Sequence, residues 1–104
     1  MIHLTIQTRT VEAAERLAAH LMERHLLLHP TMDTDHEELT WAEGRLTRTS
    51  QLLLQGMTKA LLYREIEQAA MALLGHDLVR MHGTPITHMD PEAQKRLLEQ
   101  TAKT

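Results

Sequence analysis

Histidine is the residue type in this sequence that is best suited to chemistry, because eight of the 104 residues are histidines. Imidazole nitrogen is a good ligand for Zn(II), Cu(II) and Ni(II). His76, His82 and His88 bracket the stretch that is expected to form the last strand. They are the candidate ligands for Cu(II) or Zn(II), and the alternative is that they are ordinary surface or turn histidines with no joint role.

An acidic segment at 33–38 is a second candidate site. Its carboxylates, from Asp33, Asp35 and Glu37, can hold a hard or borderline cation weakly, or they can form a solvated charge run. The segment is not an EF-hand loop, because the glycine and the bidentate glutamate that such a loop requires are missing. It is not a zincin motif either, because the second histidine is absent.

Catalytic chemistry has little support in the sequence. The chain has no cysteine, which excludes a disulfide, a zinc–thiolate site and a thiol nucleophile. Ser50, the only serine, has no base beside it. No glycine-rich phosphate loop is present. We therefore expect a protein that is not an enzyme.

Charge and hydropathy limit the classes of partner. The net charge is −3, and the basic residues are few and scattered, so nucleic acid is not an expected partner. No apolar run approaches the ~20 residues of a membrane span. The first residues alternate in polarity and lack the plan of a signal peptide. A cytoplasmic location without membrane contact is the expectation.

Hydrophobic periodicity predicts the elements that would position these residues. They are a strand at 2–8, a helix at 11–25 capped by Thr10, a strand from Leu26 interrupted by Pro30, a hairpin at 39–59, a helix at 62–74 stopped by Gly75, a strand from 78 towards 86, and a last helix that begins at Asp90 and Pro91. The segment at 32–38 is expected to be a loop or a ragged strand edge.

The hairpin is the stretch around which the other elements are arranged. Glu43 and Gly44 form its turn, because glycine takes the positive φ that a tight reversal needs. The incoming strand carries Trp41, the only tryptophan. The outgoing strand carries an apolar run of Leu52, Leu53 and Leu54. Such a run is typical of a central strand that is covered on both faces.

This order of elements predicts the α+β class: a ferredoxin-like split βαβ fold plus a C-terminal helix, in a single domain at 1–104. Two helices would cover one face of a four-stranded antiparallel sheet and leave the other face open. Successive strand residues alternate in direction, so at least one leucine of the run must point to the open face. The predicted oligomer interface consists of Trp41, Leu52, Leu53 and Leu54. Covering them favours self-association, and the physics alone accepts a dimer.

Four stretches, which span most of the chain in one register, carry a resemblance to a known family. They are the first helix with its exit at 10–26, the hairpin motif Trp41-Ala42-Glu43-Gly44-Arg45-Leu46, Lys59 with its spacing to His76, and Pro85-Ile86-Thr87-His88 followed by Asp90. With these motifs the sequence resembles the CutA divalent-cation-tolerance family. The resemblance implies a structural and binding protein that forms a homotrimer, with itself as the partner and a role in cation tolerance or signalling.

The sequence departs from that family where metal ligands are expected. Gln7 stands where some members have a cysteine that is implicated in copper binding, and Leu28 lies near the position of another cysteine that is common at the start of the second strand. Copper(I) favours thiolate and thioether ligands, so a copper(I) site is in doubt. His76 matches a position that is tied to metal binding in some members, and His88 matches a histidine that some members carry near the end of the chain, which leaves imidazole-bound Cu(II) or Zn(II).

Two other functions compete with this interpretation. One is a PII-like module that senses nucleotides or small ligands, in which basic residues would contact phosphate: Arg45, Arg48, Lys59, Arg64 and Arg80. The long flexible loop of a PII-type protein would fall in the hairpin, but the sequence of the hairpin predicts a tight turn. The other is a small enzyme with a cleft at a subunit interface.

Overall fold

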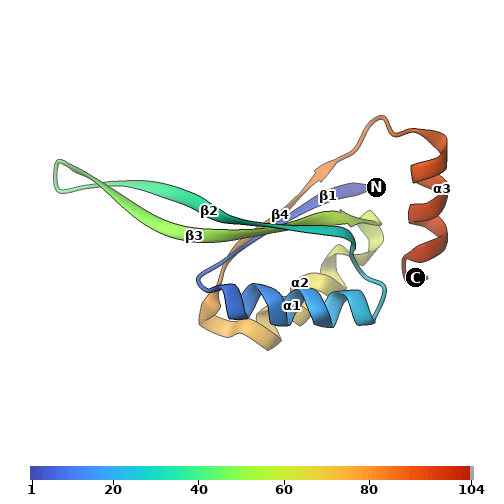
Figure 1. Ribbon diagram of the computed structural model, residues 1–104, viewed down its shortest axis with the longest axis horizontal. Coiled ribbons are helices and arrows are strands. Elements are labelled where there is room, and N and C mark those ends of the chain that lie inside the picture. Colours follow the sequence, from blue (N-terminus) through green and yellow to red (C-terminus); the bar gives the residue numbers. More distant parts are fainter. Residues whose placement is uncertain (104) are drawn as a thin grey trace.

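Strands and helices form a two-layer structure in the computed structural model, which describes residues 1–103 (Figure 1). The elements are β1 (Ile2–Thr8), α1 (Val11–Glu23), β2 (Leu28–Ala42), β3 (Arg45–Thr58), α2 (Tyr63–Leu74), β4 (Leu78–Pro85) and α3 (Pro91–Gln100). Short 3-10 turns at Ala60–Leu62 and Gly75–Asp77 flank α2. The last residue of the predicted domain, Thr104, lies outside the described residues.

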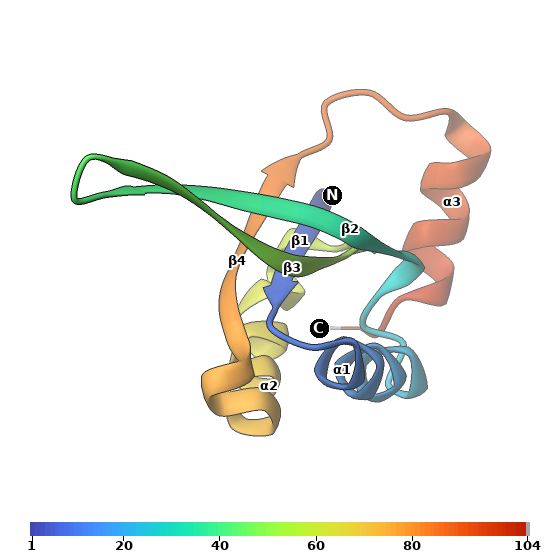
Figure 2. The ribbon, with the colours of Figure 1, turned by 60° about the vertical axis from the view of Figure 1, so that its left-hand side comes forward.

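The four strands form one antiparallel sheet in the order β2-β3-β1-β4. Helices α1 and α2 lie together on one side of this sheet (Figure 2). The order and the one-sided cover confirm the predicted ferredoxin-like α+β fold. The same order places β2 and β4 at the two outer edges, where each has only one neighbouring strand.

The core lies between the sheet and the two helices. Leu4 and Ile6 of β1 are fully buried there and pack with Leu17 of α1 and Ile66 of α2. Alternation sends the intervening residues of β1 to the other side of the sheet. We call that second side the open face, and the side that carries the helices the covered face.

The three leucines of β3 divide between these faces. Leu54 pairs with Ile6 and Leu52 pairs with Thr8, and both leucines are buried on the covered face. Leu53 pairs with Gln7 on the open face and is half-buried. Leu52 and Leu54 are therefore core residues of the single chain, which corrects the predicted interface because neither can reach a partner on the open face.

Local sequence signals set the helix ends. The Thr10 hydroxyl accepts a hydrogen bond from the amide of Ala13 at 3.1 Å, so Thr10 caps α1 as predicted. Gly75 ends α2 with a φ of 53°, and Asp90 caps α3. Helix α1 ends before 25 because His25 has a φ of 57°, which a right-handed helix does not allow.

The hairpin turn is a two-residue reversal at Glu43 and Gly44, with φ angles of 54° and 71°. Two positive φ values are typical of the type I′ turn that matches the twist of a hairpin. The segment at 32–38 is strand instead of loop, although the pairing with β3 shifts between Asp33 and His36. The strand edge is therefore ragged, which was the second of the two predicted forms.

The hairpin has two parts, a base and an arm. The base comprises 28–33 and 52–58, where β3 is flanked by β1 on its other side; the arm comprises 36–51. The arm projects from the body of the molecule (Figure 1), whose extents are 49 × 29 × 20 Å. Its projection explains a radius of gyration of 14.9 Å, where a compact chain of this length has about 13 Å.

The C-terminal segment closes the end of the sheet away from the arm (Figure 1). The Lys59 ammonium donates a hydrogen bond to the carbonyl of Ala102 at 3.0 Å, and the amide of Ala102 donates to the carbonyl of His25 at 2.7 Å. Leu97 of α3 is buried. Within residues 1–103, no helix has the length and apolar character needed to cross a membrane.

Candidate functional site

The open face is the side of the sheet opposite α1 and α2, and its side chains are mainly polar. Cross-strand pairing sets its membership. It contains His3, Thr5 and Gln7 of β1, Gln51, Leu53, Gln55 and Met57 of β3, Arg80, His82 and Thr84 of β4, and Asp33 and His36 of β2. Leu53 and Met57 in this set are large and apolar, and Leu28 of β2 pairs with Met57 on the same face. The face can therefore form hydrogen bonds as well as apolar contacts.

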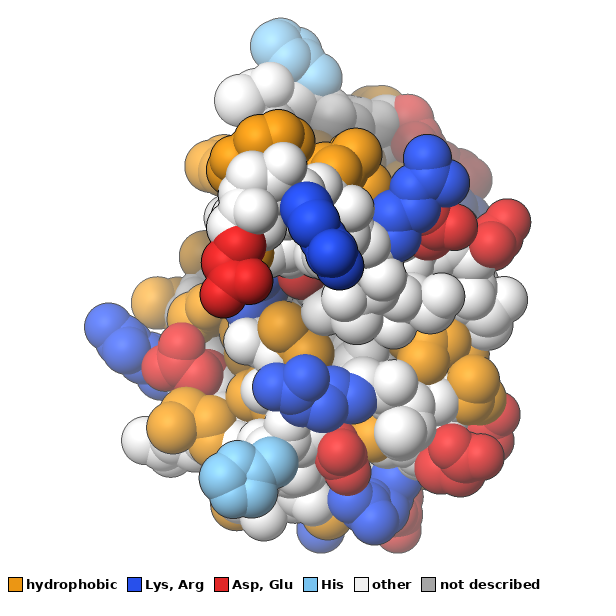
Figure 3. Space-filling model, turned by 90° about the vertical axis from the view of Figure 1, so that its left-hand side faces the viewer, with side chains coloured by type: hydrophobic (Ala, Val, Ile, Leu, Met, Phe, Trp, Pro, Cys, Tyr) orange, Lys and Arg blue, Asp and Glu red, His pale blue; other side chains and the backbone are white. Residues whose placement is uncertain are grey.

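The arm carries most of the exposed apolar surface of the hairpin. Trp41 is 71% exposed and pairs with Leu46, which is 55% exposed. Leu39 lies two residues along β2 on the same side and is 58% exposed. Seen from the arm side, hydrophobic side chains alternate with charges of both signs (Figure 3). In the single chain the arm is a two-stranded ribbon without cover, an arrangement that is marginally stable by itself.

The two outer strands carry opposite charge. The sequence of β2 contains four carboxylates and no lysine or arginine: Asp33, Asp35, Glu37 and Glu38. The sequence of β4 contains Arg80 and His82 and no carboxylate. Each of these edges presents unpaired backbone donors and acceptors that can pair with another strand. The two edges are thus complementary to each other, and neither is complementary to itself.

One ion pair joins these two outer strands within the chain. The Arg80 guanidinium donates to the carboxylate of Glu38, which lies in the arm. Because β1 and β3 lie between β4 and β2, this pair must span the open face. The side chain of Arg80 is 58% exposed and that of Glu38 is 29% exposed, so solvent screens their attraction.

Two glutamines lie on the same face as this ion pair. Gln7 pairs with Arg80 on one side and with Leu53 on the other. Gln51 is two residues from Leu53 on the same face. Both side chains are buried, at 6% and 7% exposed. Among the described residues, neither the amide nitrogen Nε2 of Gln7 nor the amide oxygen Oε1 of Gln51 has a hydrogen-bond partner.

The structure does not bring the three predicted metal ligands to one site. His76 precedes β4 and His88 follows it, and the strand between them has eight residues at ~3.3 Å each. Two imidazoles cannot share an ion over that length, since Zn–N bonds are about 2 Å. Within residues 1–103, no three histidine or carboxylate side chains are grouped closely enough to hold a metal.

His82 has a histidine neighbour that the sequence did not indicate. On the open face His82 pairs with Thr5, and His3 lies two residues away on the same strand β1. Such diagonal neighbours are roughly 7–8 Å apart. The two imidazoles can therefore approach a common ion from one side.

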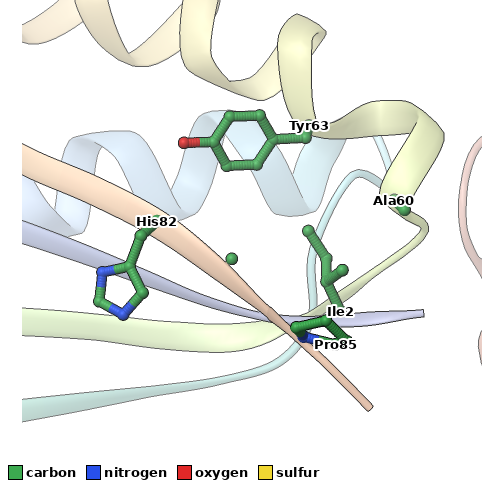
Figure 4. Close-up of a pocket in the computed structure, with 6 residues that line it drawn as sticks. Ile2, Ala60, Tyr63, His82 and Pro85 are labelled. Atoms are coloured by element: carbon green, nitrogen blue, oxygen red, sulfur yellow. The ribbon is translucent and has the colours of Figure 1, made fainter. Parts of the chain in front are cut away.

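A shallow pocket lies at the edge of β4, on the covered side of the sheet (Figure 4). Its volume is about 380 Å³, and it is lined by Ile2, Ala60, Tyr63, His82, Gly83 and Pro85. The Tyr63 hydroxyl donates to the carbonyl of Met81 at 3.3 Å. Burial raises the pKa of Tyr63, and the nearby Glu67 carboxylate raises it further. The phenol therefore stays protonated, which suits a donor and does not suit a base.

The basic residues of the nucleotide alternative are dispersed and largely engaged. Arg48 lies 3.7 Å from Glu37, and Arg64 lies 3.2 Å from Glu67. Lys59 is held by the C-terminal segment through its bond to the carbonyl of Ala102. Arg80 is paired with Glu38. No set of them converges on a cradle for phosphate in the described part of the chain.

Comparison with known proteins gives a clear result for the fold. No protein-family model matches the sequence, and no curated protein matches it in sequence. CutA1 from Oryza sativa superposes with a TM-score of 0.87 at 20% identity, covering 99% of this chain and 94% of that one. The fold of this chain is the CutA1 fold.

Two further solved structures extend this likeness. The divalent cation tolerance protein CutA1 of Thermus thermophilus has a TM-score of 0.84 at 20% identity and covers 97% of this chain and 98% of its own. The periplasmic divalent cation tolerance protein CutA of Archaeoglobus fulgidus has a TM-score of 0.82 at 19% identity, with 95% and 96% covered. The correspondence extends over nearly the whole length of each chain.

Proposed function

We propose that this chain is a divergent, cysteine-free member of the CutA family, and that it acts as a non-catalytic, self-associating protein of divalent-cation tolerance or signalling. The observation that carries the proposal is the projecting arm within a CutA1 fold. An uncovered ribbon with Trp41, Leu39 and Leu46 exposed needs a second surface.

The chemistry of the edges supports another copy of the chain as that surface. An acidic β2 on one subunit fits a basic β4 on the next, which makes the contact head-to-tail. Head-to-tail contacts form a ring when the rotation between neighbours closes. The number three follows from the resemblance to the CutA family, and Leu53 and Trp41 are the apolar contact residues that remain from the sequence prediction.

Light scattering and native mass spectrometry of protein without a histidine tag test this proposal together. The expected result is a mass of three chains at micromolar concentration. A single-chain mass would contradict self-association, and a two-chain mass would keep the open-face argument and reject the trimer. The same spectra report any retained metal or nucleotide, which separates the CutA interpretation from the PII-like one.

Metal binding is the finer part of the proposal. We propose weak binding of Zn(II) or Cu(II) by surface imidazoles, and the pair of His82 and His3 is better placed than His76 and His88, which lie beyond opposite ends of β4. Neutral imidazole is the ligand, so acidification below the usual imidazole pKa of ~6.5 weakens binding.

Titration calorimetry with Zn(II) at pH 7.5 and 5.5 tests the metal proposal. His3→Ala and His82→Ala are each expected to lower the affinity at pH 7.5, while His20→Ala on α1 serves as the control. Loss only in His76→Ala or His88→Ala would move the site to that residue. Equal affinity in all variants at both pH values would remove imidazole as the ligand.

A further inference from the structure

The two buried glutamines are the feature of this molecule that the fold alone does not explain. Gln7 and Gln51 are each more than nine-tenths buried, and one leaves a donor unpaired while the other leaves an acceptor unpaired. Buried polar groups in proteins are almost always hydrogen-bonded, so an unpaired group calls for a specific cause. Two such groups on neighbouring strands of one face point to a shared cause.

Both amides are buried within the single chain, and an ion pair lies on the same face. Arg80 lies directly opposite Gln7, and its ion pair with Glu38 spans the open face in the direction of Gln51. Ion pairs between partly exposed side chains contribute little to stability, so this one opens at small cost. Opening it frees Arg80 for another carboxylate.

We propose that Gln7 and Gln51 are contact residues of the subunit interface, and that each hydrogen-bonds a group of the neighbouring copy once the Arg80–Glu38 pair has opened. This inference rests on the proposed self-association. Charge complementarity identifies the occupant as a second copy, because the acidic β2 of a neighbour supplies Arg80 with a replacement carboxylate. The Arg80–Glu38 pair within one chain then stands in for a pair between chains.

The partner's atoms follow from what is unpaired. The amide nitrogen of Gln7 requires an acceptor, and the amide oxygen of Gln51 requires a donor. A strand edge or a polar side chain of the neighbouring copy provides both. The interface therefore includes hydrogen bonds from both amides, with Leu53 as an apolar contact beside Gln7.

The effect of Gln→Met on the stability of the assembly distinguishes an interface contact from simple burial. Methionine has nearly the length of glutamine without its polar atoms. If the amides stay unpaired in the assembly, Gln→Met removes a penalty and the protein loses nothing. If a neighbour pairs them, Gln→Met leaves the neighbour's groups unsatisfied and weakens the assembly.

The experiment measures Gln7→Met, Gln51→Met and the control Gln68→Met, which lies on the exposed side of α2. Sedimentation over a dilution series gives the dissociation constant of the assembly, and thermal unfolding at high dilution gives the stability of the separated chain. Gln7→Met and Gln51→Met are each expected to raise the dissociation constant about tenfold or more. Gln68→Met should leave it unchanged, and the separated chains of Gln7→Met and Gln51→Met should be at least as stable as the wild type.

Three outcomes would overturn the inference. Association of Gln7→Met and Gln51→Met as tight as that of the wild type would show that the amides make no contact between copies. A loss of stability in the separated chain with unchanged association would place both amides in an internal network. If the wild type retains a small molecule in native mass spectra and Gln7→Met or Gln51→Met loses it while associating normally, the face would be a ligand site instead. A monomeric wild type would instead remove the proposed assembly itself.

Discussion

The base and the arm of the β2–β3 hairpin are one continuous ladder with two different sources of stability. In the base, Leu52 and Leu54 are buried and neighbouring strands satisfy the backbone on both sides of β3. In the arm, every residue from 39 to 50 is exposed. The base is held by its own chain, while the arm has only its internal ladder. The difference teaches that the covered face determines the fold, and that the arm is available for another molecule.

A cavity in the base should have the largest effect. Leu54→Ala removes a fully buried side chain from the core, and the free energy of unfolding is expected to fall by about 2–5 kcal/mol. Urea denaturation measures this. The matched variant Leu46→Ala lies in the arm and is 55% exposed, so in the dissociated chain it should change stability by less than about 0.5 kcal/mol. Similar losses in both variants would contradict the comparison.

A charge on the open face of the base should act on association instead of folding. Leu53→Asp removes about 1.5–3 kcal/mol of apolar burial in the assembly and adds a carboxylate that must be desolvated. We expect light scattering to show the mass of a single chain that remains folded by circular dichroism. Met71→Asp, at 60% exposed on α2, is the control and should keep the wild-type mass. A Leu53→Asp assembly with the wild-type mass would exclude this face as the contact.

Truncation of the tryptophan should sharpen the comparison from the side of the arm. Trp41→Ala is expected to lower the stability of the assembly by about 1.5–3 kcal/mol for each tryptophan that is buried there. The stability of the separated chain should hardly change, because Trp41 is 71% exposed in it. Denaturation at high and low protein concentration measures the two cases. Equal losses at both concentrations would mean that Trp41 packs within its own chain.

The turn at the tip should give the smallest effect. Gly44→Ala places a side chain at a φ of 71°, which costs about 1 kcal/mol. Glu43→Asn, at a φ of 54°, should cost nothing, because asparagine tolerates this region. Thermal unfolding compares the two variants. A neutral Gly44→Ala would show that the arm contributes too little to the unfolding transition to be detected.

Signals between near neighbours in the sequence predicted most of the fold. Thr10, Gly75 and Asp90 mark helix ends because caps act over three or four residues. Alternation in β1 gave its buried face correctly. The faces of the three leucines at 52–54 were harder to predict, because a continuous apolar run does not show which residues point to the core. Pairing with Ile6 and Thr8 places Leu54 and Leu52 in the core.

The candidate site depended on register and was largely missed. Gln7 and Gln51 are ordinary polar residues in sequence, and only the pairing of β1 with β3 places them together. The diagonal of His3 and His82 arises in the same way from the pairing of β1 with β4. The Arg80–Glu38 pair joins residues 42 positions apart, so no local pattern indicates it. Alternation in β1 did predict that Gln7 and Ile6 point to opposite faces of the sheet, and this was the one sequence signal for the position of Gln7.

The placement of the aromatic side chains has a consequence for spectroscopy. The chain has one tryptophan, one tyrosine and no phenylalanine. Trp41 lies near the tip of the arm, and Tyr63 begins α2 beside the body of the sheet. Tryptophan emission therefore reports on the arm alone, and excitation transfer from tyrosine reports how near an arm comes to a body. The wild-type protein carries its own donor and acceptor, so the docking of the arm can be followed by light without any label.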